Sequence, residues 1–96
     1  MATLILEDGR ERTVTPANAK TGFTLAELYR AIGCKVVEVV RLRDGRLLVI
    51  DENGKLLGRE VNDLATNLAR AVLQAHDVIV GPALLCSSRE FQKSTT

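Results

Sequence analysis

The sequence predicts an α+β domain with the element order β-β-α-β-β-α-β, an antiparallel or mixed sheet with two helices on one face. The first observation is that Asp-Gly occurs twice in closely similar surroundings, at Asp8-Gly9 and Asp44-Gly45, between aliphatic runs, which is a strong hairpin signal. The second is that a helix start signal follows each candidate hairpin. The third is a last apolar, β-branched segment, so a β-β-α unit used twice is expected to be closed by a final strand.

The first unit begins with strands over residues 2–7 and 11–15, joined by a two-residue turn. Thr24 is the predicted N-cap of the helix that follows. Glu27, three residues later, completes a capping box, and Gly33 supplies the C-terminal stop. We therefore expect the first helix between Thr24 and Gly33.

The second hairpin spans about residues 35–51, and a two-residue turn at Asp44-Gly45 would set Val40 opposite Val49. Alternation then gives two faces that are both apolar over much of their length. A sheet with its helices on one side should be polar on the other, so two apolar faces predict a second covering layer, for which an oligomer interface is the simplest source. The residues expected in this homo-oligomer interface are Val39, Leu48 and Ile50.

The second helix is expected to begin after Asn62, a good N-cap, and to run to about Ala75. The apolar segment 78–80 is predicted to lie inside the sheet. Gly81-Pro82 then bends or ends the ladder, because proline has no N–H to donate.

Length and composition bound the remaining possibilities. The 96 residues, 46% of them hydrophobic, predict one domain over residues 1–86 and a polar tail over 87–96 that frays. A net charge of +1 and only three aromatic residues exclude a general nucleic-acid binder with a broad basic surface. No stretch approaches the roughly 18 apolar residues of a membrane span, and no secretory signal pattern is present. We expect a cytoplasmic protein.

The sequence offers no recognisable catalytic, metal or cofactor signature. His76 follows a helix end, where a histidine more often interacts with the helix dipole than catalyses a reaction. Glu38 and Asp51 would face one another across the second hairpin, either as a shifted carboxylate pair or simply as solvated groups at the sheet end. Cys34 and Cys86 stand far apart, and with one histidine they make no zinc constellation. We predict that the protein is not an enzyme and holds no metal or cofactor.

The most suggestive cluster is basic. Alternation places Arg41, Arg43 and Arg46 together on one face at the tip of the second hairpin, where guanidinium groups bind phosphate bidentately. If that face lies at an oligomer interface, arginines of neighbouring subunits would converge on an anionic nucleotide, with Lys55 and Asn62 nearby. The alternative is that the arginines are solubilising charges that protect a sheet edge.

The order of these segments resembles a known family. The resemblance rests on the two hairpins and the short helix, on an Asp-x-Asn-Gly-Lys-type turn, and on two later segments, Val61-Asn62-x-x-Ala65-Thr66 and Asp77-Val78-Ile79-Val80-Gly81-Pro82-Ala83-Leu84. From about Thr3 to Leu85 the chain is similar to a small domain-of-unknown-function family, numbered thirty-eight forty-six, of phages, plasmids and their bacterial hosts. The resemblance implies a mobile-element accessory protein of the host bacterial cytoplasm, with counter-defence as a natural role. It supplies no catalytic residues, and Asn62, Thr66 and Gly81 match its pattern.

Two functional hypotheses from different classes remain open. The first is a non-catalytic protein that sequesters a small anionic nucleotide signal of host immunity, with a ligand set of Arg41, Arg43, Arg46, Lys55, Asn62 and Thr66. The second is a protein-interaction module that oligomerises and binds a host protein through an apolar sheet face. An enzyme ranks third, and specific nucleic-acid binding ranks below it.

Overall fold

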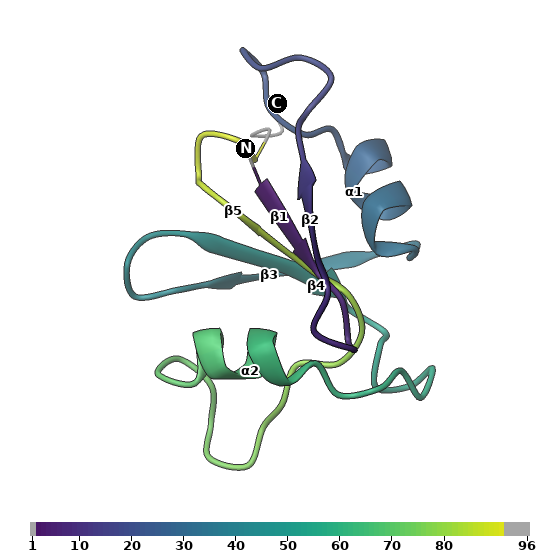
Figure 1. Cartoon of the computed structure of the whole chain (residues 1–96), viewed down its shortest axis with the longest axis vertical. Helices are drawn as coiled ribbons and strands as arrows, with labels where there is room; N and C mark the ends of the chain where they lie inside the picture. The colour runs from purple at the N-terminus through teal and green to yellow at the C-terminus, as the bar shows by residue number, and fades with distance from the viewer. Residues whose placement is uncertain (1, 92–96) are drawn as a thin grey trace.

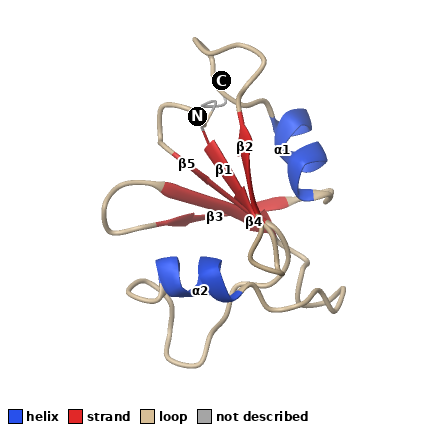
Figure 2. Cartoon of the chain, viewed as in Figure 1, coloured by secondary structure: helices blue, strands red, loops and turns tan. Residues whose placement is uncertain are grey.

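A computed structural model describes residues 2–91 of the chain, and it confirms an α+β fold with the expected element order. Figure 1 and Figure 2 show one sheet with a helix on either side of it. The elements are β1 (Ala2–Ile5), β2 (Glu11–Val14), α1 (Leu25–Ile32), β3 (Val37–Arg41), β4 (Leu47–Asp51), α2 (Asp63–Ala69) and β5 (Ala83–Cys86). Within the described residues no helix is long and apolar enough to cross a membrane.

The five strands lie in the order β2-β1-β5-β4-β3, and each neighbouring pair is antiparallel. The last strand therefore sits at the centre and joins the two hairpins into one sheet. In the first hairpin the earlier strand is the inner one, whereas in the second hairpin the earlier strand is the outer one. The two β-β-α segments are thus not one arrangement repeated.

The central strand begins later than expected. The predicted strand at residues 78–80 contributes only an isolated bridge between Val80 and Val61, and the ladder starts at Ala83. Gly81 has a φ of +77°, which turns the chain, and Pro82 cannot donate to a ladder. The proline therefore precedes the strand and does not terminate it.

The expectation that both helices cover one face is wrong, because α1 and α2 lie on opposite faces (Figure 1). The α1 face buries Phe23, Leu28, Ile32, Leu47, Val49 and Leu84, with others around them. The α2 face buries Leu42, Leu48, Ile50, Ala65, Ala69, Ile79 and Ala83. The central strands are apolar on both faces, so each face needs its own cover, and the chain supplies one helix to each.

Both hairpin turns are one residue longer than a two-residue loop. Leu6 N–H donates to the carbonyl oxygen of Arg10 at 2.8 Å, and Leu42 N–H donates to that of Arg46 at 2.9 Å. The glycine in each turn has a φ of +90°, as expected of a three-residue loop with a left-handed third position. The predicted register was therefore wrong by one residue, and Val40 pairs with Leu48 instead of Val49.

This shift overturns the predicted oligomer interface. Leu48 and Ile50 lie on the α2 face, where they are 0% and 8% exposed, and Val39 lies on the other face against the α1 core. A one-residue slip moves a side chain to the opposite face of a sheet, which is why the three residues do not share a surface. The second covering layer inferred from the sequence is the chain's own α2.

The helix signals were informative to different degrees. The capping box at α1 is confirmed, since Thr24 Oγ1 accepts from Glu27 N–H and the Glu27 carboxylate accepts from Thr24 N–H. Gly33 ends that helix with a φ of +76°. Asn62 caps α2 as expected, but α2 ends at Ala69, six residues before the predicted end. The chain continues there in turns, which bring Leu73 against the α2-face core.

The predicted polar tail is in part ordered structure. Phe23 N–H donates to the carbonyl oxygen of Glu90 at 2.6 Å, and Phe91 packs against the α1-face core. The domain therefore extends to Phe91 instead of ending at residue 86. The rest of the tail, residues 92–96, lies outside the described residues.

Candidate functional site

The loop between β4 and α2 is constrained by hydrogen bonds within itself. Within it, Gly54 N–H donates to Asp51 O at 3.1 Å, Leu57 N–H to Asn53 O at 3.0 Å and Arg59 N–H to Gly54 O at 3.0 Å. These bonds fold residues 52–58 into successive turns. Figure 1 shows this loop projecting from the body of the protein at the lower right.

A partly buried ion pair anchors the loop at its base. Arg59 Nε donates to Asp51 Oδ2 at 2.7 Å, and Arg59 Nη2 donates to Gly33 O at the end of α1 at 2.5 Å. The Asp51 side chain is 2% exposed, and its other oxygen accepts from Asn53 N–H at 2.9 Å. Gly54 lies so close to Val80 that an added Cβ would approach a Val80 methyl group to 2.9 Å. The loop is thus held to β4, to α1 and to the segment before β5.

The loop carries two leucines into solvent. Leu56 is 88% exposed and Leu57 is 67% exposed, more than any other large hydrophobic residue of the described part of the chain. Together with Gly33, Cys34, Lys35, Asp51 and Asn53 they line a hollow of about 640 Å³. Lys35 is exposed there and makes no ion pair within residues 2–91. We call residues 52–58, which carry Leu56 and Leu57 beside this hollow, the leucine loop.

A second hollow lies on the α2 face. Its volume is about 370 Å³, and its lining residues are Thr3, Ile5, Glu11, Leu64, Asn67, Leu68 and Leu85. Five strands spaced about 4.8 Å apart make a sheet roughly twice as wide as one helix of about 10 Å, so one helix leaves part of each face uncovered. The hollow is such an uncovered part, between α2 and the β1–β2 hairpin, and we call it the α2 groove.

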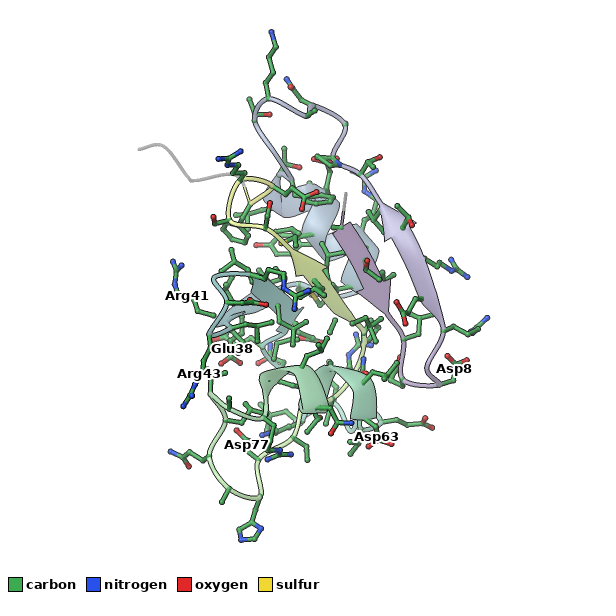
Figure 3. The ribbon with its side chains drawn as sticks, turned by 60° about the vertical axis from the view of Figure 1, so that its left-hand side comes forward. Asp8, Glu38, Arg41, Arg43, Asp63 and Asp77 are labelled. Carbon is green, nitrogen blue, oxygen red and sulfur yellow. The ribbon has the colours of Figure 1, made fainter. Side chains whose placement is uncertain are left out.

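The predicted arginine cluster is not assembled. Arg46 Nε donates to Asp44 Oδ2 at 2.7 Å, just as Arg10 does to Asp8 in the first hairpin. Arg41 shares the α1 side of β3 with Val39, and Arg43 lies in the turn. Figure 3 shows Arg41 and Arg43 projecting away from the body of the protein. Both are exposed, and neither makes an ion pair with another described residue.

The other predicted ligand residues are engaged within the protein. The Lys55 ammonium donates to the Asp77 carboxylate. Asn62 is fully buried, where its amide donates to Ile5 O and to Gly81 O at 2.9 Å each while its oxygen caps α2. Thr66 is buried, and its hydroxyl accepts from Ile79 N–H at 2.9 Å. Asn62 and Thr66 therefore join α2 to the segment before β5 and do not lie on a ligand surface.

The carboxylate pair considered from the sequence is not formed either. Asp51 pairs with Val37 across the hairpin, while Glu38 pairs with Ile50, so the two carboxylates leave the sheet on opposite faces. His76 is exposed, in a loop with a φ of +77°. Among residues 2–91 no group of three or more histidine, cysteine, aspartate or glutamate side chains is arranged to hold a metal ion.

Neither cysteine has the lowered pKa of a nucleophilic thiol. Burial raises the pKa of Cys86 to about 11, and the nearby charge of Glu90 adds to this shift. Burial also raises the pKa of Cys34, with a further contribution from the Asp51 carboxylate. Nucleophilic cysteines need a lowered pKa, so the environments of these thiols disfavour the thiolate.

The leucine loop and its anchor were missed in the sequence. Residues 51–55 were recognised as a turn, but Leu56 and Leu57 follow that turn and precede Gly58, so two adjacent leucines stand inside a loop. That placement was an available signal of exposed apolar side chains. The pairing of Arg59 with Asp51 had no sequence signal, because it depends on how the loop folds back on β4.

One comparison with known proteins gives a match. The family model described as "Domain of unknown function (DUF3846)" matches residues 1–96, which is the whole chain. No curated protein and no solved structure matches the chain.

Proposed function

The chain belongs to the DUF3846 family, and we propose that this member is a non-catalytic accessory protein that binds a protein partner through its leucine loop. This is the interaction-module hypothesis, with the docking surface moved from the sheet face to the loop. In a mobile-element product, which the resemblance implies, the partner would be a host protein or a second copy of the chain. The observation that carries the proposal is the exposure of Leu56 and Leu57.

Two adjacent leucines in water are an unfavourable arrangement. Fully burying one leucine side chain is worth about 1.5–3 kcal/mol relative to leaving it exposed. Single exposed apolar residues are ordinary, but an adjacent pair beside a hollow of about 640 Å³ is a contiguous apolar surface. A partner that covers both side chains would recover this free energy.

The anchoring of the loop favours docking over fold stability as the role of the leucines. Residues 52–58 are held by their own hydrogen bonds and by the Asp51–Arg59 pair, so the leucines are presented from a fixed backbone. A preorganised loop loses little conformational entropy on binding. The same leucines contribute little to the core, since both side chains are mostly in solvent.

The lining of the hollow indicates the partner's chemistry. An apolar pocket or an apolar side chain of the partner would cover Leu56 and Leu57. A carboxylate of the partner at the rim of the hollow would pair with the exposed Lys35 ammonium. Such a charge pair contributes mainly to the association rate and to partner choice.

The test is affinity capture from host lysate, followed by crosslinking of the captured complex through lysines and mapping of the crosslinks. The wild-type protein should hold one defined protein, with crosslinks at Lys35, which lines the hollow, and at Lys55, which precedes Leu56. The variant Leu56→Asp/Leu57→Asp should lose that protein. Leu25→Asp is the matched control, because Leu25 is 52% exposed on α1, away from the loop.

Circular dichroism of each variant separates loss of binding from loss of folding. Capture that survives in the folded Leu56→Asp/Leu57→Asp variant contradicts the proposal. Equal loss in the Leu25→Asp variant contradicts it as well, because the effect would then not be specific to the loop.

A second candidate function is binding of a small anionic nucleotide, which the two exposed arginines favour. Arg41 and Arg43 carry charge at the tip of the second hairpin without an internal partner among the described residues. Titration calorimetry with a cyclic dinucleotide, with inorganic phosphate as reference anion, tests this function. Arg41→Glu and Arg43→Glu should each abolish binding, and Arg12→Glu, an exposed arginine on β2, should not. Retention of binding by both hairpin variants would exclude it.

A further inference from the structure

The partner of the leucine loop can be sought on the protein itself. We infer that the chain self-associates head to tail, with Leu56 and Leu57 of one copy inserted into the α2 groove of a second copy and Lys35 facing Glu11 across the contact. This inference rests on the proposed function, since it names the partner of the same loop. It places the oligomer contact on the leucine loop and on the part of the sheet that α2 leaves uncovered, and not on Val39, Leu48 and Ile50.

The first support is the apolar match between the two surfaces. The α2 groove has an apolar floor of Ile5 and Leu85 and an apolar wall of Leu64 and Leu68. Leu64 and Leu68 remain 41% and 39% exposed, although they belong to a helix whose other side is in the core. The chain therefore carries both a projecting pair of leucines and a concave apolar site in which such side chains would be covered.

The second support is charge complementarity. Glu11 is the charged residue of the α2 groove lining, and Lys35 is the unpaired cation of the hollow beside the leucines. Neither makes an ion pair with another described residue. Lys35 of one copy could therefore pair with Glu11 of the second copy. This charge pair favours one orientation of the contact.

The two surfaces are different, so the contact is heterologous. The groove is made by β1, β2, β5 and α2, whereas the loop lies between β4 and α2 and is anchored to the end of α1. A contact between unlike surfaces leaves one of each free, so further copies add until a ring closes or a filament grows. The inference therefore predicts species larger than a dimer at high concentration.

Sedimentation analysis of the full chain, from about 1 µM to about 1 mM, measures this association over the range of weak interfaces. The wild-type mass should rise from the 10.5 kDa of the monomer to several multiples of it. Leu57→Asp removes the projecting side chain and Leu68→Asp the groove wall, and each should weaken association at least tenfold. Val72→Asp is the matched control for Leu68→Asp, because Val72 is 41% exposed but lies outside the groove lining.

Mixing the two defective variants gives the sharpest result. The Leu57→Asp protein retains a groove and the Leu68→Asp protein retains a leucine loop, so an equimolar mixture should form a 1:1 complex that does not grow further. An interface between two identical surfaces would not be restored by mixing. Lys35→Glu and Glu11→Lys should each weaken association, and the two changes in one chain should restore it.

Three outcomes would overturn the inference. One is a wild-type protein that stays at the monomer mass throughout the concentration range. Another is association that the folded Leu68→Asp variant keeps; if that variant does not fold, Asn67→Arg in the groove lining replaces it. A third is a mixture of the defective variants that remains monomeric. A monomeric protein that still captures a host partner, and loses it in Leu56→Asp/Leu57→Asp, would overturn self-association and leave the proposed function standing.

Discussion

Arg59 binds the buried carboxylate of Asp51 through a 2.7 Å hydrogen bond from Nε to Oδ2. The Nη2 group of Arg59 donates to Gly33 O. The pair thereby connects the end of β4, the end of α1 and the base of the leucine loop. Asp51 is 2% exposed in its side chain and Arg59 is 24% exposed, so the carboxylate is the group that depends on its partner.

Removing the guanidinium should therefore destabilise the fold strongly. Arg59→Met keeps the aliphatic stem but leaves the Asp51 charge buried and unpaired, which we expect to cost about 3 kcal/mol in the free energy of unfolding. Urea denaturation measures this change. Arg10→Met is the control, because the Arg10–Asp8 pair is exposed and should change stability by less than about 1 kcal/mol. Equal effects of the two changes would contradict the assigned role of the buried pair.

Asn62 should be one of the least replaceable polar residues of the chain. Its fully buried amide joins β1, α2 and the segment before β5, by donating to Ile5 O and Gly81 O and by accepting from Ala65 N–H. Asn62→Asp keeps the cap acceptor but loses both donated bonds, so we expect a loss of about 2–4 kcal/mol from two unsatisfied carbonyls and a buried charge. Asn67→Asp, on the exposed side of α2, should be nearly neutral. Thermal and urea unfolding of both variants decide between a capping role and a joining role.

The α1 capping box should make stability depend on pH in the acid range. Folding holds the pKa of Glu27 below its ordinary 4.5, first because Thr24 N–H donates to the carboxylate and next because Ala17 N–H does. A lowered folded pKa stabilises the fold above the unfolded pKa, and this contribution is lost as pH falls through the folded pKa. We expect the free energy of unfolding to decrease below about pH 4.5.

Glu27→Gln should flatten this dependence, and Glu60→Gln, at an exposed glutamate, should not. The wild-type slope will not vanish entirely in Glu27→Gln, because hydrogen bonds from Arg10 to Asp8 and from Arg46 to Asp44 lower the pKa of those carboxylates with the same sign. Urea unfolding from pH 3 to pH 7 gives the slopes. Identical curves for Glu27→Gln and the wild type would show that ionisation of Glu27 does not contribute to the pH dependence of the free energy of unfolding.

The thiols should differ in their rates of modification. With a pKa of about 11, Cys86 is thiolate in only roughly one molecule in a thousand at pH 8, and it is 2% exposed. We expect a disulfide reagent to modify Cys34 slowly in native buffer and Cys86 only after unfolding. Cys34→Ser isolates Cys86 for the measurement. Native-state modification of Cys86 at the rate of an unfolded-chain thiol would contradict its burial.

The local features of the fold were predictable because each depends on residues that are only a few positions apart in the sequence. The capping box of Thr24 and Glu27, the stop at Gly33 and the cap at Asn62 each depend on groups within a few residues, and the structure confirms all three. The hairpins were also predicted, but their register was not. Asp44 accepts from Arg46 N–H and Nε, which accompanies a three-residue turn, and the extra residue reversed the faces assigned to the strand residues.

The candidate site was predicted poorly for a related reason. Arg41, Arg43 and Arg46 share a face only in the register that the turn does not adopt, while Asn62 and Thr66 were visible as polar residues but not as buried ones. Leu56 and Leu57 read as apolar, and only the fold of their loop shows that they face water. Exposure is a property of the assembled chain, so composition alone assigns it unreliably.

The sequence by itself determined the element order, the hairpin positions and the helix caps, because hydrogen bonds to near neighbours and side-chain periodicity act locally. Only the tertiary structure decided that β5 lies at the sheet centre, that α1 and α2 cover opposite faces, and that Asp51 and Arg59 fix the loop between them. These arrangements join residues distant in the chain. The central strands are apolar on both faces, and both faces are buried only when distant parts of the chain pack against them in the folded molecule.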